Sequence, residues 1–179
     1  MSATTVLVID MMNSYQHDDA ELLIPSVEKI INPVTDLVQR ARDSRDVDLV
    51  YVNDNYGDFA SGFTDIVRTA CEGARPDLVE PIVPAEGNPV LTKVRHSAFY
   101  ATSVAYLLRR LETQRLILVG QVTEQCILYT ALDAYIRHIP VVVPRDGVAG
   151  IHAELSTAAL KMMQANMAAE LTSAADCLG

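Results

Sequence analysis

The sequence has no cluster of Lys or Arg along its 179 residues, and its 14 basic residues are outnumbered by 23 Asp and Glu. The resulting net charge of −9 argues against binding to a nucleic-acid backbone or an anionic membrane surface. No apolar run approaches the ~18 residues of a membrane span, and no basic segment precedes the first apolar run as in a signal peptide. We therefore expect a cytoplasmic protein without nucleic-acid or membrane partners.

Cysteine is also scarce. Cys71, Cys126 and Cys177 are an odd number of cysteines, at spacings that fit neither a disulfide framework nor a zinc knuckle. This usage favours a reducing compartment, in agreement with the predicted cytoplasmic location.

The site motifs of several other α/β enzymes are missing. A flavin or dinucleotide site needs a glycine-rich or hydroxyl-rich phosphate loop after the first strand, but residues 10–17, DMMNSYQH, contain no glycine. An aspartyl-nucleophile phosphatase would need a second Asp where Met12 stands. Neither a G-x-S-x-G elbow nor a G-x-x-x-x-G-K-[ST] loop occurs. We expect no cofactor.

The hydrophobic pattern predicts one α/β domain spanning residues 1–179. Half of the residues are apolar and 21% are charged, which suits one well-filled core. Short apolar runs predict strands at 5–9, 48–53, 90–92, 116–119, 140–143 and 169–172. Apolar residues at helical spacing predict helices at 24–42, 62–71, 102–111, 126–134 and 154–167. This alternation indicates a doubly wound, mainly parallel sheet of about six strands with helices on both faces.

Two segments depart from this regular alternation. Pro33 lies inside the helix predicted at 24–42 and is expected to break or restart it. Residues 72–88 are rich in Pro, Gly and acidic residues, so we expect an irregular surface excursion near the active face.

Three chemically active residues stand at or just past the carboxyl ends of predicted strands. Asp10, Lys93 and Cys126 should therefore meet at one edge of the sheet, where ligands bind. Cys126 also begins a helix, where backbone N–H groups and the helix dipole favour a low-pKa thiolate and can bind an oxyanion. Each residue has a structural alternative: Asp10 could cap a turn, Lys93 could reach solvent and Cys126 could be core. Together they supply a nucleophile, a proton acceptor and a cation to hold both.

Four motifs in order resemble those of one known family. They are VIDMMNSY at 8–15, KVRHSAFYAT at 93–102, GQVTEQCILYTALDA at 120–134 and VVVPRDGVAG at 141–150. Over nearly its whole length the chain resembles the isochorismatase-like cysteine hydrolase superfamily, which includes nicotinamidases and N-carbamoyl amidases. The resemblance implies a Rossmann-like fold.

The resemblance also implies roles for particular residues. Cys126 is similar to the family's nucleophile, Asp10 to its general acid/base, and Lys93 to the residue that orients the two. A cis peptide bond is implied between Gln121 and Val122. The backbone N–H groups of Val122 and Cys126 would then form an oxyanion hole.

Two departures from the family patterns narrow the expected activity. Isochorismatases proper lack the cysteine, so Cys126 makes the chain similar to the amide-cleaving branch. Nicotinamidases bind a metal through D-x-H, and here that motif is replaced by Asp54-Asn55-Tyr56. We therefore expect no bound metal, and nicotinamide is not the favoured substrate.

The resemblance also indicates residues that could contact the substrate. Tyr15 and Tyr100 stand where relatives place pocket aromatics, and Asn55 could provide a polar contact. Packing in the core or on the surface is the alternative for these three residues.

Taken together, the residues and the resemblance predict a small amidohydrolase that uses a Cys-Asp-Lys triad. Its substrate would be a small amide, carbamoyl or ureido compound, hydrolysed through a thioester on Cys126. Two alternatives stay open: a non-catalytic domain that binds a small ligand or a partner protein, and a redox-sensitive thiol protein. The resemblance and the apolar helix at 158–167 further suggest a homodimer or homotetramer.

Overall fold

A parallel sheet lies at the centre of the molecule, which a computed structural model describes over residues 3–178. Residues 1, 2 and 179, at the ends of the domain predicted at 1–179, lie outside the described residues. Within residues 3–178 the sheet has seven strands: β1 (Ala3–Ile9), β2 (Val47–Asp54), β3 (Val90–Lys93), β4 (Thr113–Gln121), β5 (Val141–Pro144), β6 (Val148–Ala149) and β7 (Glu170–Thr172).

All strand pairings in the sheet are parallel. The hydrogen-bonded order is β3-β2-β1-β4-β5-β7, and β6 pairs with the end of β4. The predicted α/β class and parallel sheet are therefore confirmed. The hydrophobic pattern missed β6 because that strand contains only Val148 and Ala149.

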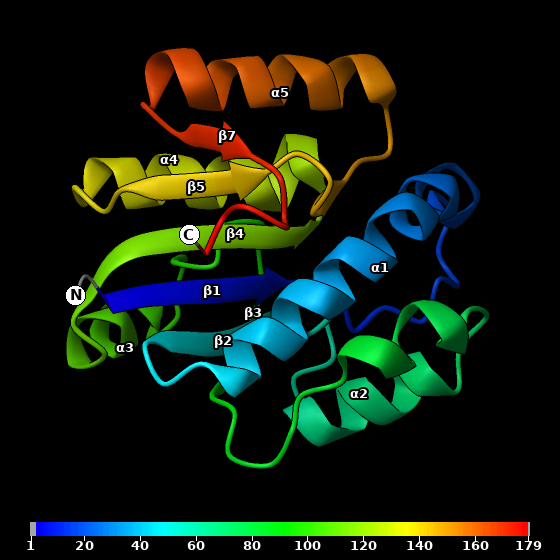
Figure 1. Cartoon of the computed structure of the whole chain (residues 1–179). Helices are drawn as coiled ribbons and strands as arrows, with labels where there is room; N and C mark the ends of the chain where they lie inside the picture. The colour runs from blue at the N-terminus through cyan, green and yellow to red at the C-terminus, as the bar shows by residue number, and fades with distance from the viewer. Residues whose placement is uncertain (1–2, 179) are drawn as a thin grey trace.

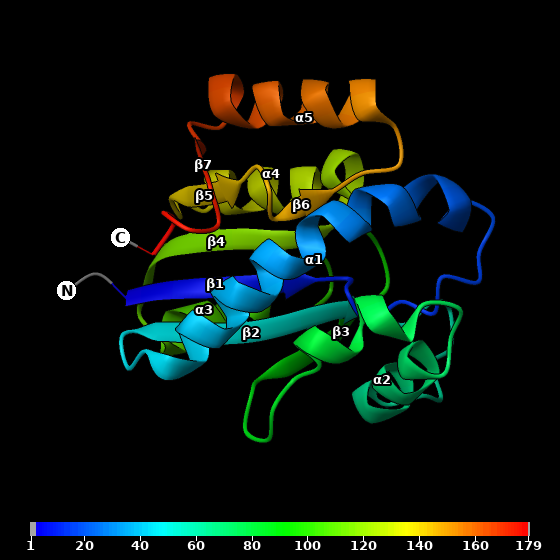
Figure 2. The same cartoon turned by 45° about the vertical axis from the view of Figure 1, so that its right-hand side comes forward.

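Helices cover both faces of the sheet, as predicted. They are α1 (Ala20–Asp43), α2 (Phe63–Cys71), α3 (Val104–Arg110), α4 (Leu128–Ile136) and α5 (Ala153–Asn166). Figures 1 and 2 show α1 crossing one face, with α3 and α4 behind the sheet. None of the helices within residues 3–178 has both the length and the apolar composition needed to cross a membrane.

The alternation of side chains along β1 divides the core into two layers. Val6 and Val8 pack on the side of α1, whereas Leu7 and Ile9 pack on the side of α3, α4 and α5. Successive residues of a strand point to opposite faces, so a strand covered on both faces is apolar at every position. This explains the uninterrupted run of β-branched and aliphatic residues at 5–9.

The prediction that Pro33 breaks the first helix is wrong. Helix α1 runs without interruption and contains both Pro25 and Pro33. Pro33 lacks the N–H that would bond to the carbonyl four residues earlier, which belongs to the exposed residue Lys29. Water can solvate that carbonyl, while the buried apolar face of α1 keeps the helix on the sheet.

Residues 72–88 are irregular, but they are not only a surface excursion as predicted. Two short 3₁₀ turns, Pro76–Leu78 and Glu80–Ile82, lie within this segment. Leu78, Val79 and Ile82 are fully buried and join the core on the side of α1. Burial of these three apolar side chains ties the segment to the domain.

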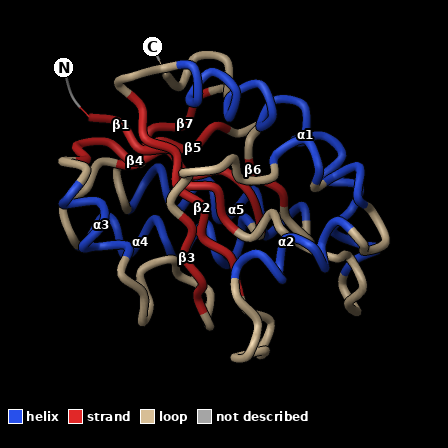
Figure 3. The backbone as a smooth tube through the Cα atoms, turned by 90° about the horizontal axis from the view of Figure 1, so that it is seen from below, coloured by secondary structure: helices blue, strands red, loops and turns tan. Residues whose placement is uncertain are grey.

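The strand order reverses between β1 and β4. From this point β2 and β3 extend to one side, and β5 and β7 extend to the other. Figure 3 shows the strands between α1 and the pair α3 and α4. Gly120 allows β4 to approach β1 here, because its φ is +116° and a Cβ would lie 2.1 Å from the Ile9 carbonyl oxygen. The crevice beyond the carboxyl ends of these strands is the expected ligand site.

Candidate active site

Three polar side chains meet beyond the carboxyl ends of the strands. Asp10 directly follows β1, Lys93 is the last residue of β3, and Cys126 lies in a π-helical turn, Thr123–Ile127, between β4 and α4. The Lys93 Nζ lies 2.8 Å from the Asp10 Oδ2 and 3.6 Å from the Cys126 Sγ. The structure thus brings together the residues that the strand ends predict to meet, and their catalytic roles stay predictions.

The Asp10 carboxylate accepts a hydrogen bond on each oxygen. The Asp54 backbone N–H donates to Oδ1 at 2.7 Å, and the Lys93 ammonium group binds Oδ2. The Asp10 carbonyl accepts a 2.6 Å hydrogen bond from the Gln121 Nε2. Burial raises the pKa of Asp10, although Lys93 opposes this rise. The carboxylate is therefore a stronger base than a solvated aspartate.

Lys93 is buried between two carboxylates and a thiol. Its Nζ lies 3.3 Å from the Asp54 Oδ2, in addition to its contacts with Asp10 and Cys126. Burial lowers the pKa of Lys93, but Asp10, Cys126 and Asp54 outweigh burial and raise the pKa above its ordinary value. Lys93 therefore remains a cation inside the protein.

Cys126 does not have the low pKa that its position at a helix start predicts. The residue is 7% exposed, and burial and the Asp10 carboxylate raise the pKa of its thiol. Lys93 and the Val122 N–H lower that pKa by less. The interpretation as a resting thiolate is therefore wrong, because desolvation and a neighbouring carboxylate outweigh the cation and the backbone donor. The resting thiol carries its proton beside a proton acceptor.

The backbone before Cys126 presents a donor to its sulfur. The Gln121–Val122 peptide bond is cis, and the Val122 N–H interacts with the Cys126 thiol. The Val122 carbonyl accepts the N–H groups of Gln125 at 3.0 Å and of Ile127 at 3.1 Å, which fixes the turn. The Val122 N–H therefore lies beside the sulfur, and its part in an oxyanion hole stays a prediction.

A hollow of about 490 Å³, here called the rim hollow, lies beyond the ends of β2 and β3, and Asp54, which pairs with Lys93, lines it. Its lining includes Asp54, Tyr56, Arg95 and His96, and it also contains Asn55 and Tyr100, two of the three predicted substrate contacts.

Tyr15, the third predicted contact, lies in the core instead. It is 3% exposed, its hydroxyl donates to the Gln121 Oε1 at 3.5 Å, and burial raises its pKa to about 12. The structure thus favours the packing alternative for Tyr15.

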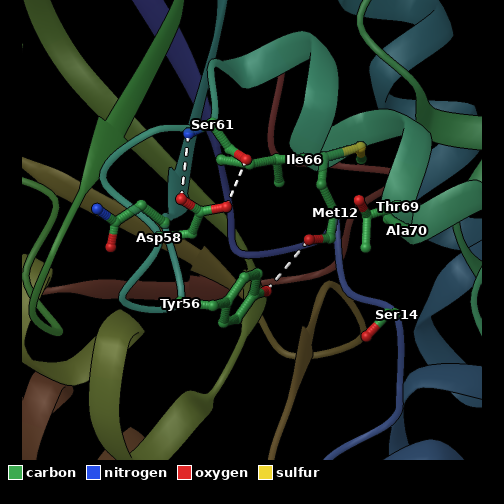
Figure 4. Close-up of a pocket in the computed structure, with 9 residues that line it drawn as sticks. Met12, Ser14, Tyr56, Asp58, Ser61, Ile66, Thr69 and Ala70 are labelled. Atoms are coloured by element: carbon green, nitrogen blue, oxygen red, sulfur yellow. Dashed lines mark hydrogen bonds between the residues drawn. The ribbon is translucent and has the colours of Figure 1, made fainter.

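Tyr56 separates the rim hollow from a smaller cavity of about 120 Å³, shown in Figure 4. The Tyr56 hydroxyl donates to the Met12 carbonyl at 3.1 Å and accepts from the Asn53 Nδ2 at 3.4 Å. Burial of this hydroxyl, with the nearby Asp10, raises the pKa of Tyr56 well above its ordinary value. The Tyr56 side chain is therefore uncharged, its hydroxyl is fixed by these hydrogen bonds, and it lines both cavities.

The residues at the D-x-H position do not fit a metal ion. Asp54 is paired with Lys93, Asn55 is an amide, and the Tyr56 hydroxyl is bonded to Met12. Within residues 3–178, no three His, Cys, Asp or Glu side chains gather in positions that could hold a metal ion. We therefore assign no metal ligand here.

Sequence reasoning did not predict the contacts of three residues that hold the site. Asp54 is the last residue of β2 and Gln121 is the last residue of β4, so the rule that selected Lys93 at a strand end could have found both. Glu124 precedes Cys126 by two residues and binds the start of α5 through hydrogen bonds to Ile151 and His152. No local sequence signal predicts that contact, because it joins segments 27 and 28 residues apart.

Known proteins share both the sequence pattern and the fold. Residues 4–176 match the family model described as the Isochorismatase domain. The isochorismatase family protein YaaI of Bacillus subtilis is 32% identical over 93% of this chain and 92% of its own length. Maleamate amidohydrolase of Pseudomonas putida is 31% identical over 83% of this chain and 73% of its own. The structure of N-carbamoylsarcosine amidase from Thermoplasma acidophilum aligns over all of both chains with a TM-score of 0.78 at 24% identity.

Proposed function

The chain belongs to the isochorismatase family, and on that premise we propose that it is a cysteine-dependent hydrolase of small amide, carbamoyl or ureido compounds. The main support for this proposal is the position of the Lys93 Nζ, which lies 2.8 Å from the Asp10 Oδ2 and 3.6 Å from the Cys126 Sγ. A nucleophile, a base and a cation are thereby joined in one buried cluster. The relatives named as amidases support the same reaction class.

The first half of the proposed reaction forms a thioester. Asp10 accepts the Cys126 proton as the sulfur attacks the carbonyl carbon, and Lys93 stabilises the thiolate as it forms. The carbonyl oxygen becomes an oxyanion, and the backbone N–H groups of Val122 and Cys126 would bind it. The C–N bond then breaks as Asp10 returns the proton to the leaving amine.

The second half releases the acid and restores the enzyme. Asp10, again a carboxylate, takes a proton from a water molecule as that water attacks the thioester carbon. The C–S bond breaks, and the proton held by Asp10 returns to the Cys126 sulfur. The raised pKa of both groups suits this exchange, because the proton can rest on either partner between steps.

Ammonia release from a panel of primary amides, N-carbamoyl compounds and ureido acids tests the proposal. The wild-type protein should release ammonia from at least one class, and Cys126→Ala should release none above the uncatalysed rate. Equal ammonia release by Cys126→Ala would overturn the proposal. The matched control is Cys71→Ala, because Cys71 is half-buried at the end of α2 and makes no contact with Asp10 or Lys93 within residues 3–178.

The geometry is less favourable for the alternative of a redox-sensing thiol. A thiol that reacts readily with peroxide has a low pKa and is accessible, whereas Cys126 is buried and burial raises its pKa. Intact mass after peroxide should therefore show little oxidation of Cys126 under conditions that leave the fold intact. The cytoplasmic location inferred from cysteine usage stays a proposal.

A further inference from the structure

The backbone of Asp10 has a conformation that a side-chain-bearing residue rarely adopts. Its φ is +54°, in the left-handed region that favours glycine. The regular pairing of β1 with β2 and β4 ends at Ile9, and the Asp10 N–H donates to the Val52 carbonyl at 3.0 Å. A disfavoured conformation persists only where surrounding contacts hold it, so the chain beyond β1 needs further partners.

Two buried amide side chains supply these partners. Gln121 is the last residue of β4, and its Nε2 donates to the Asp10 carbonyl at 2.6 Å. Asn53 lies in β2, where its Oδ1 accepts the Met12 N–H at 2.9 Å and its Nδ2 donates to the Met12 carbonyl at 3.1 Å. Because β2 and β4 flank β1, the two amides, here called the amide clamp, hold residues 10–12 from both sides.

Each amide of the clamp is also fixed by a tyrosine hydroxyl. The Gln121 Oε1 accepts the Tyr15 hydroxyl at 3.5 Å, and the Asn53 Nδ2 donates to the Tyr56 hydroxyl at 3.4 Å. An amide bonded at both its oxygen and its nitrogen loses a hydrogen bond if it rotates. Tyr15, predicted as a substrate contact, therefore orients Gln121 instead.

The clamp acts on the backbone of the proposed base, whereas other groups act on its carboxylate. The carboxylate oxygens of Asp10 bind the Asp54 N–H and the Lys93 Nζ. Without the Gln121 amide, the buried Asp10 carbonyl would lose its 2.6 Å partner and the backbone could leave the left-handed region. The carboxylate would then move away from Lys93, and a displacement of about 1 Å in an active site can cost roughly 10²-fold in rate.

We infer that Gln121 is a positioning residue for the proposed reaction, and that it holds Asp10 in the conformation from which the carboxylate meets Lys93. Asn53 supports the same segment from the other side. The inference rests on the proposed function and adds a residue that acts through Asp10 and not on the substrate. It therefore predicts changes in turnover and in the proton affinity of Asp10, with substrate binding unaffected.

Gln121→Met tests this role, because methionine keeps the length of the side chain and fills the buried space but donates no hydrogen bond. Its kcat should fall by about 10–100-fold, with KM close to the wild-type value. The acidic limb of kcat/KM should shift to higher pH, because an Asp10 carboxylate farther from Lys93 loses the interaction that lowers its pKa. A residue that served only the fold would leave kcat and the pH profile of the folded fraction unchanged.

Two further variants complete the comparison. Gln121→Asn keeps a polar amide but withdraws it by one methylene group, so it should show the same two effects if Gln121→Met does not fold. Gln114→Met is the matched control, because Gln114 is exposed near the other end of β4. It should keep the wild-type kcat and pH profile.

The titration of the Asp10 carboxyl gives a measurement that needs no turnover. The ¹³C NMR signal of this carboxyl, assigned by its absence in Asp10→Asn, should titrate at higher pH in Gln121→Met than in the wild-type protein. An unchanged titration with wild-type kcat in folded Gln121→Met would overturn the inference, as would a raised KM with unchanged kcat. Those results leave the hydrolase proposal standing, which fails separately if ammonia release persists in Cys126→Ala.

Discussion

At the scale of single residues, Lys93 controls the proton affinity of its two reactive neighbours. Its charge lowers the pKa of both Asp10 and Cys126, against the burial that raises them. Without this cation the carboxyl and the thiol would both hold their protons to higher pH. Lys93 therefore does more than position the other two residues.

Replacing Lys93 by Ala should move two pH profiles in the same direction. Asp10 must be ionised to accept the thiol proton, so activity is lost as pH falls through its pKa. In Lys93→Ala that pKa rises, so the acidic limb of kcat/KM and the alkylation profile of Cys126 should both shift to higher pH. Lys161→Ala, at an exposed position on α5, is the control. Profiles that stay at the wild-type pH would refute this role.

Asp10→Asn should show whether Asp10 is the base. Asparagine keeps the shape of the side chain and removes its proton acceptor, so kcat should fall by about 10²–10⁴-fold, as is typical of a lost general base. Asp36→Asn, at an exposed position on α1, should keep wild-type turnover. If Asp10→Asn also keeps near-wild-type kcat on a substrate that Cys126→Ala cannot hydrolyse, Asp10 is a structural residue.

The positions of the site residues were easier to predict from sequence than their proton affinities. Asp10, Lys93 and Cys126 follow from strand ends in a parallel sheet, which are fixed by local hydrophobic patterns. The thiol pKa depends on burial and on the distance to Asp10, which only the packed structure provides. Tyr15 was misplaced for the same reason, since an aromatic after a strand can point into the core or into a pocket.

At the scale of secondary-structure elements, Glu124 connects two segments. One is the π-helical turn that contains Cys126, and the other is the start of α5. Its Oε1 accepts the N–H groups of Ile151 and His152, each at 2.9 Å, and its Oε2 accepts the Ser156 hydroxyl at 2.8 Å. A carboxylate at a helix N-terminus satisfies free N–H groups and interacts favourably with the helix dipole. Glu124 thus couples the geometry of the π-helical turn to the packing of α5.

Loss of this connection should reduce both stability and activity. Glu124→Ala should lower the free energy of unfolding by about 1–3 kcal/mol, as expected when partly buried donors lose a charged hydrogen-bond partner. It should also lower kcat more than KM, because the Cys126 turn is no longer fixed. Glu124→Gln keeps one acceptor oxygen and should restore part of both losses.

Glu154→Ala is the matched control for Glu124, because Glu154 is an exposed acid in the first turn of the same helix. Thermal unfolding and steady-state kinetics would measure the two effects. Wild-type kinetics in Glu124→Ala would show that the contact stabilises α5 and has no effect on the active site.

The sequence predicts the boundaries of a helix or strand where the local hydrophobic pattern determines them. It does not predict them where tertiary contacts determine them. The apolar face of α1 is long enough to hold the helix across Pro33. The short strand β6 forms because Val148 and Ala149 pair with Gly120 and Gln121 at the end of β4. A run of two apolar residues is too short to predict that pairing.

At the scale of the whole molecule, α4 exposes more large apolar side chains than α5, the helix predicted to carry the apolar surface. In the segment 158–167, Met163 and Met167 are buried in the core, whereas Met162 is 45% exposed. Helix α4 exposes Tyr129, Leu132, Tyr135 and Ile136, with exposed fractions of 41–61%. Exposed apolar faces of this kind are typical of protein–protein contacts.

We expect a second copy of the chain to cover the α4 face, giving a homodimer or homotetramer. Light scattering at micromolar concentration should therefore report a mass at least twice that of the 19.6 kDa chain. Ile136→Glu, on the α4 face, should reduce that mass. Leu22→Glu, at an exposed position on α1, should not. A monomeric wild-type protein would remove this prediction.

Cys126 is proposed to form a covalent thioester with the substrate, and intact mass measured during turnover would reveal this intermediate. Acid quenching of wild-type protein with a hydrolysed amide, followed by peptide mapping, should show the acyl mass of that substrate on the peptide containing Cys126. In Cys126→Ala, both the adduct and the release of ammonia should be absent. An acyl mass on another residue, or undiminished turnover in Cys126→Ala, would show that Cys126 is not the nucleophile.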